Sequence, residues 1–157
     1  MIDPRNAADF LAGHRLAVVG ASDDPKNFGG TVFRALVDHG SDPVPVNPNH
    51  PSVLGRTCYP DLAAVPGQLD GVLVMVRAEL AGDVVRQAAA LGVTKVWLFK
   101  GLGAPGAVSD EVLELCDRSG MTVVAGACPM MFLEPVGGLH RVHRAMRRLN
   151  RSVGKAA

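Results

Sequence analysis

The sequence lacks the patterns that mark several classes of protein. Its three cysteines, at positions 58, 116 and 128, are odd in number and have no C-x-x-C spacing, which argues against a disulfide framework or a structural zinc site. No stretch reaches the roughly 18 apolar residues of a membrane span, and the first 12 residues lack the apolar run of a signal peptide. We therefore expect a cytoplasmic protein that neither crosses a membrane nor binds a metal ion.

Acidic residues are also missing from the end of the chain. None follows Glu134, whereas six basic residues do: Arg141, Arg144, Arg147, Arg148, Arg151 and Lys155. Removing these six from the 16 basic residues leaves ten against 15 acidic ones, so the positive charge is concentrated in the tail. The same segment has an apolar stripe that predicts an amphipathic helix docked by that stripe, formed by Leu139, Val142, Met146 and Leu149.

This basic tail has three interpretations. A basic helix can meet nucleic acid or anionic lipid, or one of its arginines could reach a ligand phosphate. The third interpretation is a docked helix whose basic face is solvated, and we favour it. His140 and His143 lie three residues apart, but no carboxylate or cysteine nearby completes a metal site. We therefore assign residues 137–157 to the same domain as residues 1–136.

The rest of the chain alternates short apolar runs with segments of helical period. The runs predict strands at residues 16–19, 44–46, 71–76, 95–99 and 121–125, and helical segments follow at about 28–40, 81–92 and 109–119. This alternation predicts an α/β fold: a single Rossmann-like, doubly wound, mainly parallel five-stranded sheet with helices on both faces. Pro45 indicates an edge position for the second strand.

Ligands of such sheets bind at the carboxyl ends of the strands. The first of these ends is Gly20-Ala21-Ser22, and a helix starts shortly after it. Glycine permits a sharp turn close to a ligand, the Ser22 hydroxyl could donate to a phosphate, and amides at Gly29 and Gly30 could bind an anion. The dinucleotide fingerprint G-x-G-x-x-G is absent, so a plain strand-to-helix turn remains the alternative.

The end of the second strand discriminates between ligands. It reads Asn47-Pro48-Asn49-His50, without the Asp or Glu that binds the ribose hydroxyls in NAD-specific domains. An uncharged edge tolerates a phosphorylated ribose, which coenzyme A (CoA) and NADP both carry. Asn47 could equally serve to cap a turn.

Four segments together resemble a known family. They are V-V-G-A-S at 18–22, P-V-N-P at 45–48, G-R-T-C-Y-P-D-L at 55–62 and V-W-L-F-K-G at 96–101. In this order they resemble the stand-alone CoA-binding proteins, a family similar to the CoA-binding domain of the succinyl-CoA synthetase α subunit. The resemblance covers roughly residues 9–135. It implies a small non-catalytic module that binds CoA or acyl-CoA as a sensor, carrier or regulator.

The resemblance also implies which residues surround the nucleotide half of the ligand. The pyrophosphate would be surrounded by the first strand end and the following helix start, that is by Gly20, Ala21, Ser22, Asn27, Phe28 and Gly29. The adenosine half would lie beside the ends of the second and third strands, at Asn47, Pro48, Val76 and Arg77.

The same resemblance implies that the pantetheine half of the ligand lies beside the ends of the fourth and fifth strands. Phe99, Lys100 and Gly101 would border the pantetheine, although the family usually has glutamine at the position of Lys100. Cys128 would lie near the thiol of the ligand. There it could form a mixed disulfide with CoA if its pKa were lowered, or it could simply pack in a turn.

Two other functions stay open. An NADP-binding redox protein is compatible with the uncharged second strand end, although the sequence has no second domain to hold a substrate. A ligase-type subunit would need a partner chain, because the sequence ends at Ala157, before any domain like the phosphohistidine domain of the synthetase. No Ser-His-Asp order, paired carboxylates or G-K-[ST] motif is present. We therefore expect no catalytic residue in this chain.

Overall fold

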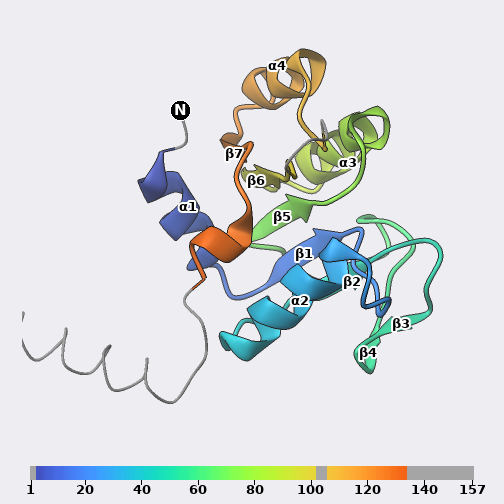
Figure 1. Ribbon diagram of the computed structural model, residues 1–157. Helices are drawn as coiled ribbons and strands as arrows, with labels where there is room; N and C mark the ends of the chain where they lie inside the picture. The colour runs from blue at the N-terminus through green and yellow to red at the C-terminus, as the bar shows by residue number, and fades with distance from the viewer. Residues whose placement is uncertain (1–2, 102–105, 134–157) are drawn as a thin grey trace, which may run out of the picture.

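The main sheet has five parallel strands, as the sequence predicts. The computed structural model describes residues 3–101 and 106–133, and the strand order is β2-β1-β5-β6-β7 (Figure 1). The strands are β1 (Leu16–Val19), β2 (Val44–Val46), β5 (Gly71–Val74), β6 (Lys95–Leu98) and β7 (Thr122–Ala125). β5 ends at Val74 and β6 at Leu98, slightly earlier than predicted. The residue after each strand still donates a hydrogen bond to the neighbouring strand, Met75 N to Val19 O and Phe99 N to Val74 O.

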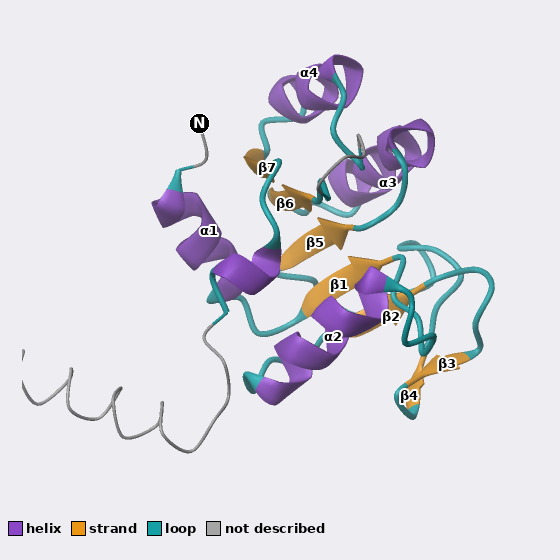
Figure 2. Ribbon diagram, in the orientation of Figure 1, coloured by secondary structure: helices purple, strands orange, loops and turns teal. Residues whose placement is uncertain are grey.

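Helices cover both faces of the sheet, which confirms the doubly wound architecture. α1 (Pro4–Leu11) and α2 (Phe28–Asp38) lie on one face, and α3 (Ala78–Ala90) and α4 (Asp110–Arg118) lie on the other (Figures 1 and 2). Successive strand residues point to opposite faces, so Leu16 and Val18 join the core under α1 and α2 while Ala17 and Val19 join the core under α3. Burial on both sides explains why the strands are continuously apolar rather than alternating.

The helix ends follow from capping residues that the sequence displays. Asn27 and Ser109 precede α2 and α4, and their side-chain oxygens accept hydrogen bonds from first-turn amides over 2.8 and 3.2 Å. Gly40 and Gly92 follow α2 and α3 with φ of 84° and 75°, the left-handed conformation in which helices commonly end.

The structure contains four elements that the sequence does not predict. α1 buries only Ala7 and Phe10, too few apolar residues to show a helical period. β3 (Ser52–Val53) and β4 (Arg56–Thr57) form a hairpin with strands of two residues each, and η1 (Pro129–Met131) is a single 3-10 turn. The amphipathic helix and the domain extent expected at residues 137–157 lie outside the described residues.

The order of the strands determines where a ligand can bind. β1 leads to β2 on one side, and the chain then crosses to β5 on the other side, so the strand order reverses between β1 and β5. This reversal opens a crevice at the carboxyl ends of the two strands. β2 lies at the sheet edge, as Pro45 indicates. Within the described part of the chain, no helix has the length and apolar character needed to cross a membrane.

Candidate functional site

A cleft of about 380 Å³ lies at the point where the strand order reverses. Its walls come from the ends of β1, β2 and β5, one side of α3, the residue before α2 and the loop after β4. The lining residues are Val19, Gly20, Asn27, Val46, Asn47, Pro48, Asn49, Pro60, Asp61, Leu62, Met75, Val76, Leu80, Asp83, Val84 and Gln87. Five of the residues expected at the site therefore line one cleft: Gly20, Asn27, Asn47, Pro48 and Val76.

Glycines allow close packing between β5, the β1 turn that lines the cleft and the start of α2. Gly20 has a φ of 98°, and a Cβ at this position would lie 2.8 Å from the carbonyl oxygen of Met75 at the end of β5. A Cβ at Gly29 would overlap the carbonyl oxygen of Gly20, and one at Gly30 would overlap that of Ser22. The start of α2 can therefore lie directly on the β1 turn only because these residues have no side chain.

The amides at the start of α2 are engaged within the protein. Asn27 Oδ1 accepts a hydrogen bond from Gly29 N over 2.8 Å, and Asn27 O accepts one from Gly30 N over 3.1 Å. Capping side chains and bound anions compete for the same free donors of a helix start. In this structure the Asn27 cap occupies two of the donors that the sequence assigns to an anion.

Asn47 and Ser22 also bond to the protein scaffold. Asn47 Nδ2 donates to the carbonyl oxygen of Ala21 over 2.9 Å, and Asn47 Oδ1 accepts from Asn49 N over 2.9 Å. Asn47 thus caps a turn and also ties the second strand end to the first. Ser22 is only 3% exposed, and its Oγ accepts from Asp24 N over 3.0 Å.

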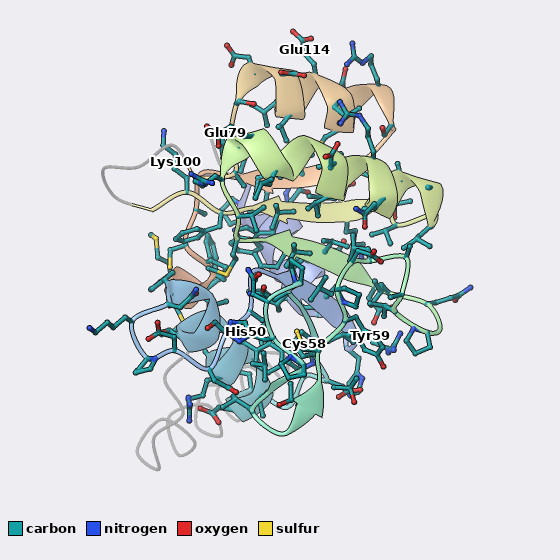
Figure 3. The ribbon with its side chains drawn as sticks, turned by 90° about the vertical axis from the view of Figure 1, so that its right-hand side faces the viewer. His50, Cys58, Tyr59, Glu79, Lys100 and Glu114 are labelled. Carbon is teal, nitrogen blue, oxygen red and sulfur yellow. The ribbon has the colours of Figure 1, made fainter. Side chains whose placement is uncertain are left out.

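The hairpin of β3 and β4, together with the residues before it, contacts the loop after β1, and the sequence does not predict this contact. Leu54 N donates to Asp23 Oδ1 over 2.7 Å, and His50 Nε2 lies 3.4 Å from Ser22 Oγ. Figure 3 shows His50 and Cys58 on this part of the molecule. His50 directly follows the Asn-Pro-Asn segment. Its position just after the end of a strand is the feature of the sequence that could have identified it as a site residue.

Two carboxylates line the cleft, although neither comes from the end of the second strand. The strand end at residues 47–50 is indeed uncharged, but Asp61 and Asp83 reach the same cleft from the loop after β4 and from α3. Asp61 Oδ1 accepts from Ala64 N over 2.9 Å, and Asp83 pairs with Arg86 at 2.7 Å. Near Asp61 and Asp83 the cleft therefore favours a hydrogen-bond donor of a ligand over a negatively charged group.

The remaining expected residues lie outside the cleft lining. Phe28 stacks on Phe99, Lys100 is exposed, and Arg77 is an exposed residue that precedes α3. Figure 3 shows Lys100 near Glu79, which lies in the first turn of α3, and away from His50 and Cys58. The expected residues thus divide into three groups: those in the cleft; those after β5 and β6 (Arg77, Phe99, Lys100 and Gly101); and those at the β1 turn, at the start of α2 and after β7 (Ala21, Ser22, Phe28, Gly29 and Cys128).

The three cysteines differ in their surroundings. Cys116 is fully buried in α4, and burial raises the pKa of its thiol, as expected for a core residue. Cys58 is also buried: desolvation raises the pKa of its thiol, and the nearby Asp23 carboxylate raises it further. Cys128 is half-buried just before η1. Cys58 and Cys116 are therefore poor nucleophiles at neutral pH.

Comparison with known proteins gives a consistent result. A family model described as a CoA binding domain matches residues 14–134. The protein YneT of Bacillus subtilis is 31% identical over 114 residues, which cover 73% of this chain and 81% of YneT. A solved structure of a hypothetical protein from Pyrococcus horikoshii OT3 has a TM-score of 0.76 and 30% identity, over 83% of this chain and 89% of that one.

A longer relative also matches. An ADP-forming acetate–CoA ligase of Archaeoglobus fulgidus is 29% identical over 118 residues, which are 72% of this chain. The chain spans only 17% of the length of that ligase.

Proposed function

Because the chain belongs to the CoA-binding domain family, we propose that it binds CoA or acyl-CoA at the carboxyl edge of its sheet, with the nucleotide half of the ligand in the cleft. The observation that carries this proposal is the cleft itself. It lies where the strand order reverses, and it is lined by both the Gly20 turn and the Asn47-Pro48 segment.

The charges around the cleft suggest how the nucleotide is oriented. Asp61 and Asp83 accept hydrogen bonds, so they suit the amino group of an adenine and repel a phosphate. The phosphates are better placed toward the opposite side, near Ser22, His50 and the exposed Lys26. We propose that Arg77 lies beside the adenosine half.

The pyrophosphate requires a local rearrangement in this proposal. Ser22 Oγ and Gly29 N bond to Asp24 N and Asn27 Oδ1, so the ligand oxygens would replace these internal contacts or accept from neighbouring donors. The exchange costs little, because one hydrogen bond replaces another of similar strength.

The pantetheine arm would then run toward the ends of β5 and β6. Phe99, Lys100 and Gly101 lie along that direction, and Cys128 lies beyond them at the end of β7. Cys128 would therefore approach the thiol of CoA. A mixed disulfide between the two sulfurs would need an oxidant and a thiolate at one of them.

The proposed role is binding rather than catalysis. The described residues offer a cleft and two buried, protonated thiols, and we assign no catalytic residue among them. We propose a cytoplasmic sensor, carrier or regulator of CoA or acyl-CoA.

A second candidate is a subunit that presents CoA to a partner chain with ligase activity. It is favoured by the likeness to part of the Archaeoglobus fulgidus ligase. ATP- and CoA-dependent ligation by the purified protein alone would contradict the binding role, whereas ligation only with an added partner would favour this candidate.

Calorimetric titration tests the proposed ligand. CoA and NADPH are titrated in the same buffer, because both carry a phosphorylated ribose and differ in the rest of the molecule. We expect heat with CoA and none with NADPH at the same concentration. Binding of NADPH alone would replace the proposal with a redox function.

A matched variant links binding to the cleft. Asn47→Asp keeps the side-chain oxygen that accepts from Asn49 N, removes the donor to Ala21 O and adds a negative charge. We expect CoA affinity to fall by at least ~10-fold, while Asn6→Asp, which adds the same charge in α1 outside the cleft lining, leaves binding intact. CoA binding that is unchanged in Asn47→Asp would place the ligand elsewhere.

A further inference from the structure

Beside the nucleotide cleft lies a pair of stacked aromatic rings. Phe28 is the first residue of α2, and its ring stacks on Phe99, which directly follows β6. The ring centroids are 5.1 Å apart and the planes are inclined by 29°. Phe28 is 42% exposed, which is unusual for so large an apolar side chain. The stack therefore presents an apolar surface at the ligand-binding edge of the sheet.

The strand order gives this surface its position. Phe28 follows the β1 turn and Phe99 follows β6, while β5 lies between β1 and β6 in the sheet. The stack thus crosses the carboxyl end of β5. Asn27 lines the cleft and is the residue before Phe28. A ligand that leaves the cleft in the direction of β6 has to pass the pair.

Both rings are mounted on closely packed backbone. The start of α2 rests on the β1 turn, where a Cβ at Gly29 would overlap the Gly20 carbonyl oxygen. Phe99 O accepts a hydrogen bond from Ala107 N over 2.8 Å, which holds the residue after β6 in place. A Cβ at Gly101 would contact the Phe99 ring at 3.5 Å. The backbone positions from which both rings extend are therefore set by the fold.

We propose that Phe28 determines specificity for the acyl group, and that the site prefers CoA thioesters of apolar acyl chains to CoA itself. The inference rests on the proposed function, because it requires that the nucleotide occupies the cleft and that the rest of the ligand runs toward β6. The acyl chain starts at the thiol near Cys128, which directly precedes η1, and η1 packs against α2, whose first residue is Phe28. The chain then lies against the exposed face of the Phe28 ring. Removal of one methylene from water is worth about fourfold in affinity when burial is complete.

Two further apolar side chains are exposed on the element that packs against α2. Met130 and Met131 lie in η1, which packs against α2, and they are 37% and 77% exposed. Thioether side chains adapt to ligands of different shape. Large apolar groups exposed together on a soluble protein commonly mark a binding surface.

Calorimetric titration of the full chain with CoA, acetyl-CoA and octanoyl-CoA tests the inference. In the unaltered protein we expect octanoyl-CoA to bind at least ~10-fold more tightly than acetyl-CoA, which corresponds to about two fully buried methylenes. Phe28→Ala should abolish this gain, so that octanoyl-CoA and acetyl-CoA bind with affinities within ~3-fold of each other. Phe28→Trp should keep the gain, since it preserves an aromatic face.

Leu91→Ala is the matched control. Leu91 is 48% exposed, but it follows α3 at the opposite edge of the sheet, so its removal should leave the gain unchanged. Equal affinities for octanoyl-CoA and acetyl-CoA, with CoA binding intact, would overturn this inference and leave the proposed function standing. Absence of binding by all three ligands would overturn both.

A structural role for Phe28 predicts a different pattern. If the ring only covers the protein's own core or another segment of the chain, Phe28→Ala lowers the melting temperature and the acyl gain persists. That result would also overturn the inference.

Discussion

The two halves of the sheet are joined to the surrounding elements in different ways. Around β1, β2 and β5, backbone touches backbone through glycine, and single polar side chains connect the loops, as Asn47 does with Ala21. Around β6 and β7, rings make the connections: Phe28 stacks on Phe99, and Trp97 packs between Phe10 and Phe132. The first half fixes the positions of polar groups, and the second offers apolar area.

This difference teaches how substitutions should act. In the glycine half a single methyl group has no space, so the cost is steric and affects folding. In the aromatic half a smaller side chain removes contact area, so the cost grows with the area lost. The variants below test that distinction, beginning with the largest expected effect.

Gly29→Ala should have the largest effect on stability. Its Cβ would overlap a backbone oxygen, which cannot move without displacing the β1 turn. We expect a loss of ~3 kcal/mol or more in the free energy of unfolding, measured by urea denaturation. Gly82→Ala is the control, because Gly82 lies inside α3 and its nearest new contact would be at 3.6 Å. This control should gain ~0.5–1 kcal/mol. Equal effects of the two variants would contradict the close packing of α2 on the turn.

Trp97→Leu tests the aromatic half. The change removes the hydrogen bond that Trp97 Nε1 donates to Ala127 O over 3.0 Å, together with two edge-to-face ring contacts. We expect a loss of ~3 kcal/mol in the free energy of unfolding, from the cavity and the unpaired carbonyl. Labelling of Cys128 by a thiol reagent should also become faster, because Ala127 is the residue that precedes it. A variant as stable as the parent protein would show that the rings carry little of the packing.

Asn47→Ala should have a moderate effect on both stability and binding. It removes the donor to Ala21 O and the acceptor for Asn49 N, so we expect a loss of ~1–2 kcal/mol. CoA affinity should fall by ~10-fold, because the hydrogen bond between the segments that follow β1 and β2 is lost. Asn49→Ala keeps the backbone bond to Asn47 and serves as the control. If Asn49→Ala weakened CoA binding more than Asn47→Ala, the second strand end would bind the ligand through Asn49 instead.

The buried thiols should give the smallest effect, a loss of stability at alkaline pH. Burial raises the pKa of Cys58 and Cys116, so the folded state holds these protons more tightly than the unfolded state does. The free energy of unfolding should therefore be constant below the ordinary thiol pKa of about 8.5 and fall as the pH rises above it. Urea denaturation at pH 7.5 and 9.5 measures the change. The double variant Cys58→Ser, Cys116→Ala should lose less stability over that interval, and an identical loss would exclude the thiols as its cause.

The fold could be predicted from the sequence because its signals are local and agree with one another. Apolar runs such as 95–99 are buried on both faces, and Ser109 and Gly92 mark helix ends by their own chemistry. α1 was missed because only Ala7 and Phe10 anchor it. The β3–β4 hairpin was missed because it turns at Leu54 and Gly55 with positive φ, and leucine gives no signal of that conformation.

The candidate site could be predicted only in part. The strand order follows from the fold class, so Gly20, Asn47 and Val76 could be placed near one crevice before any coordinates were known. Asp61 and Asp83 could not, because they come from a loop and a helix whose contact with the cleft depends on tertiary packing. The same holds for the stack of Phe28 on Phe99, which joins residues 71 positions apart in the sequence.

Amide chemical-shift mapping with CoA tests the central claim most directly. The account predicts that CoA shifts the resonances of Gly20, Asn47 and Val76 in the cleft and those of Phe28 and Phe99 at the end of β6. Resonances of Leu91 and Gly120, at the opposite edge of the sheet, should stay unchanged. Shifts confined to that opposite edge, or no shifts at millimolar CoA, would contradict the account.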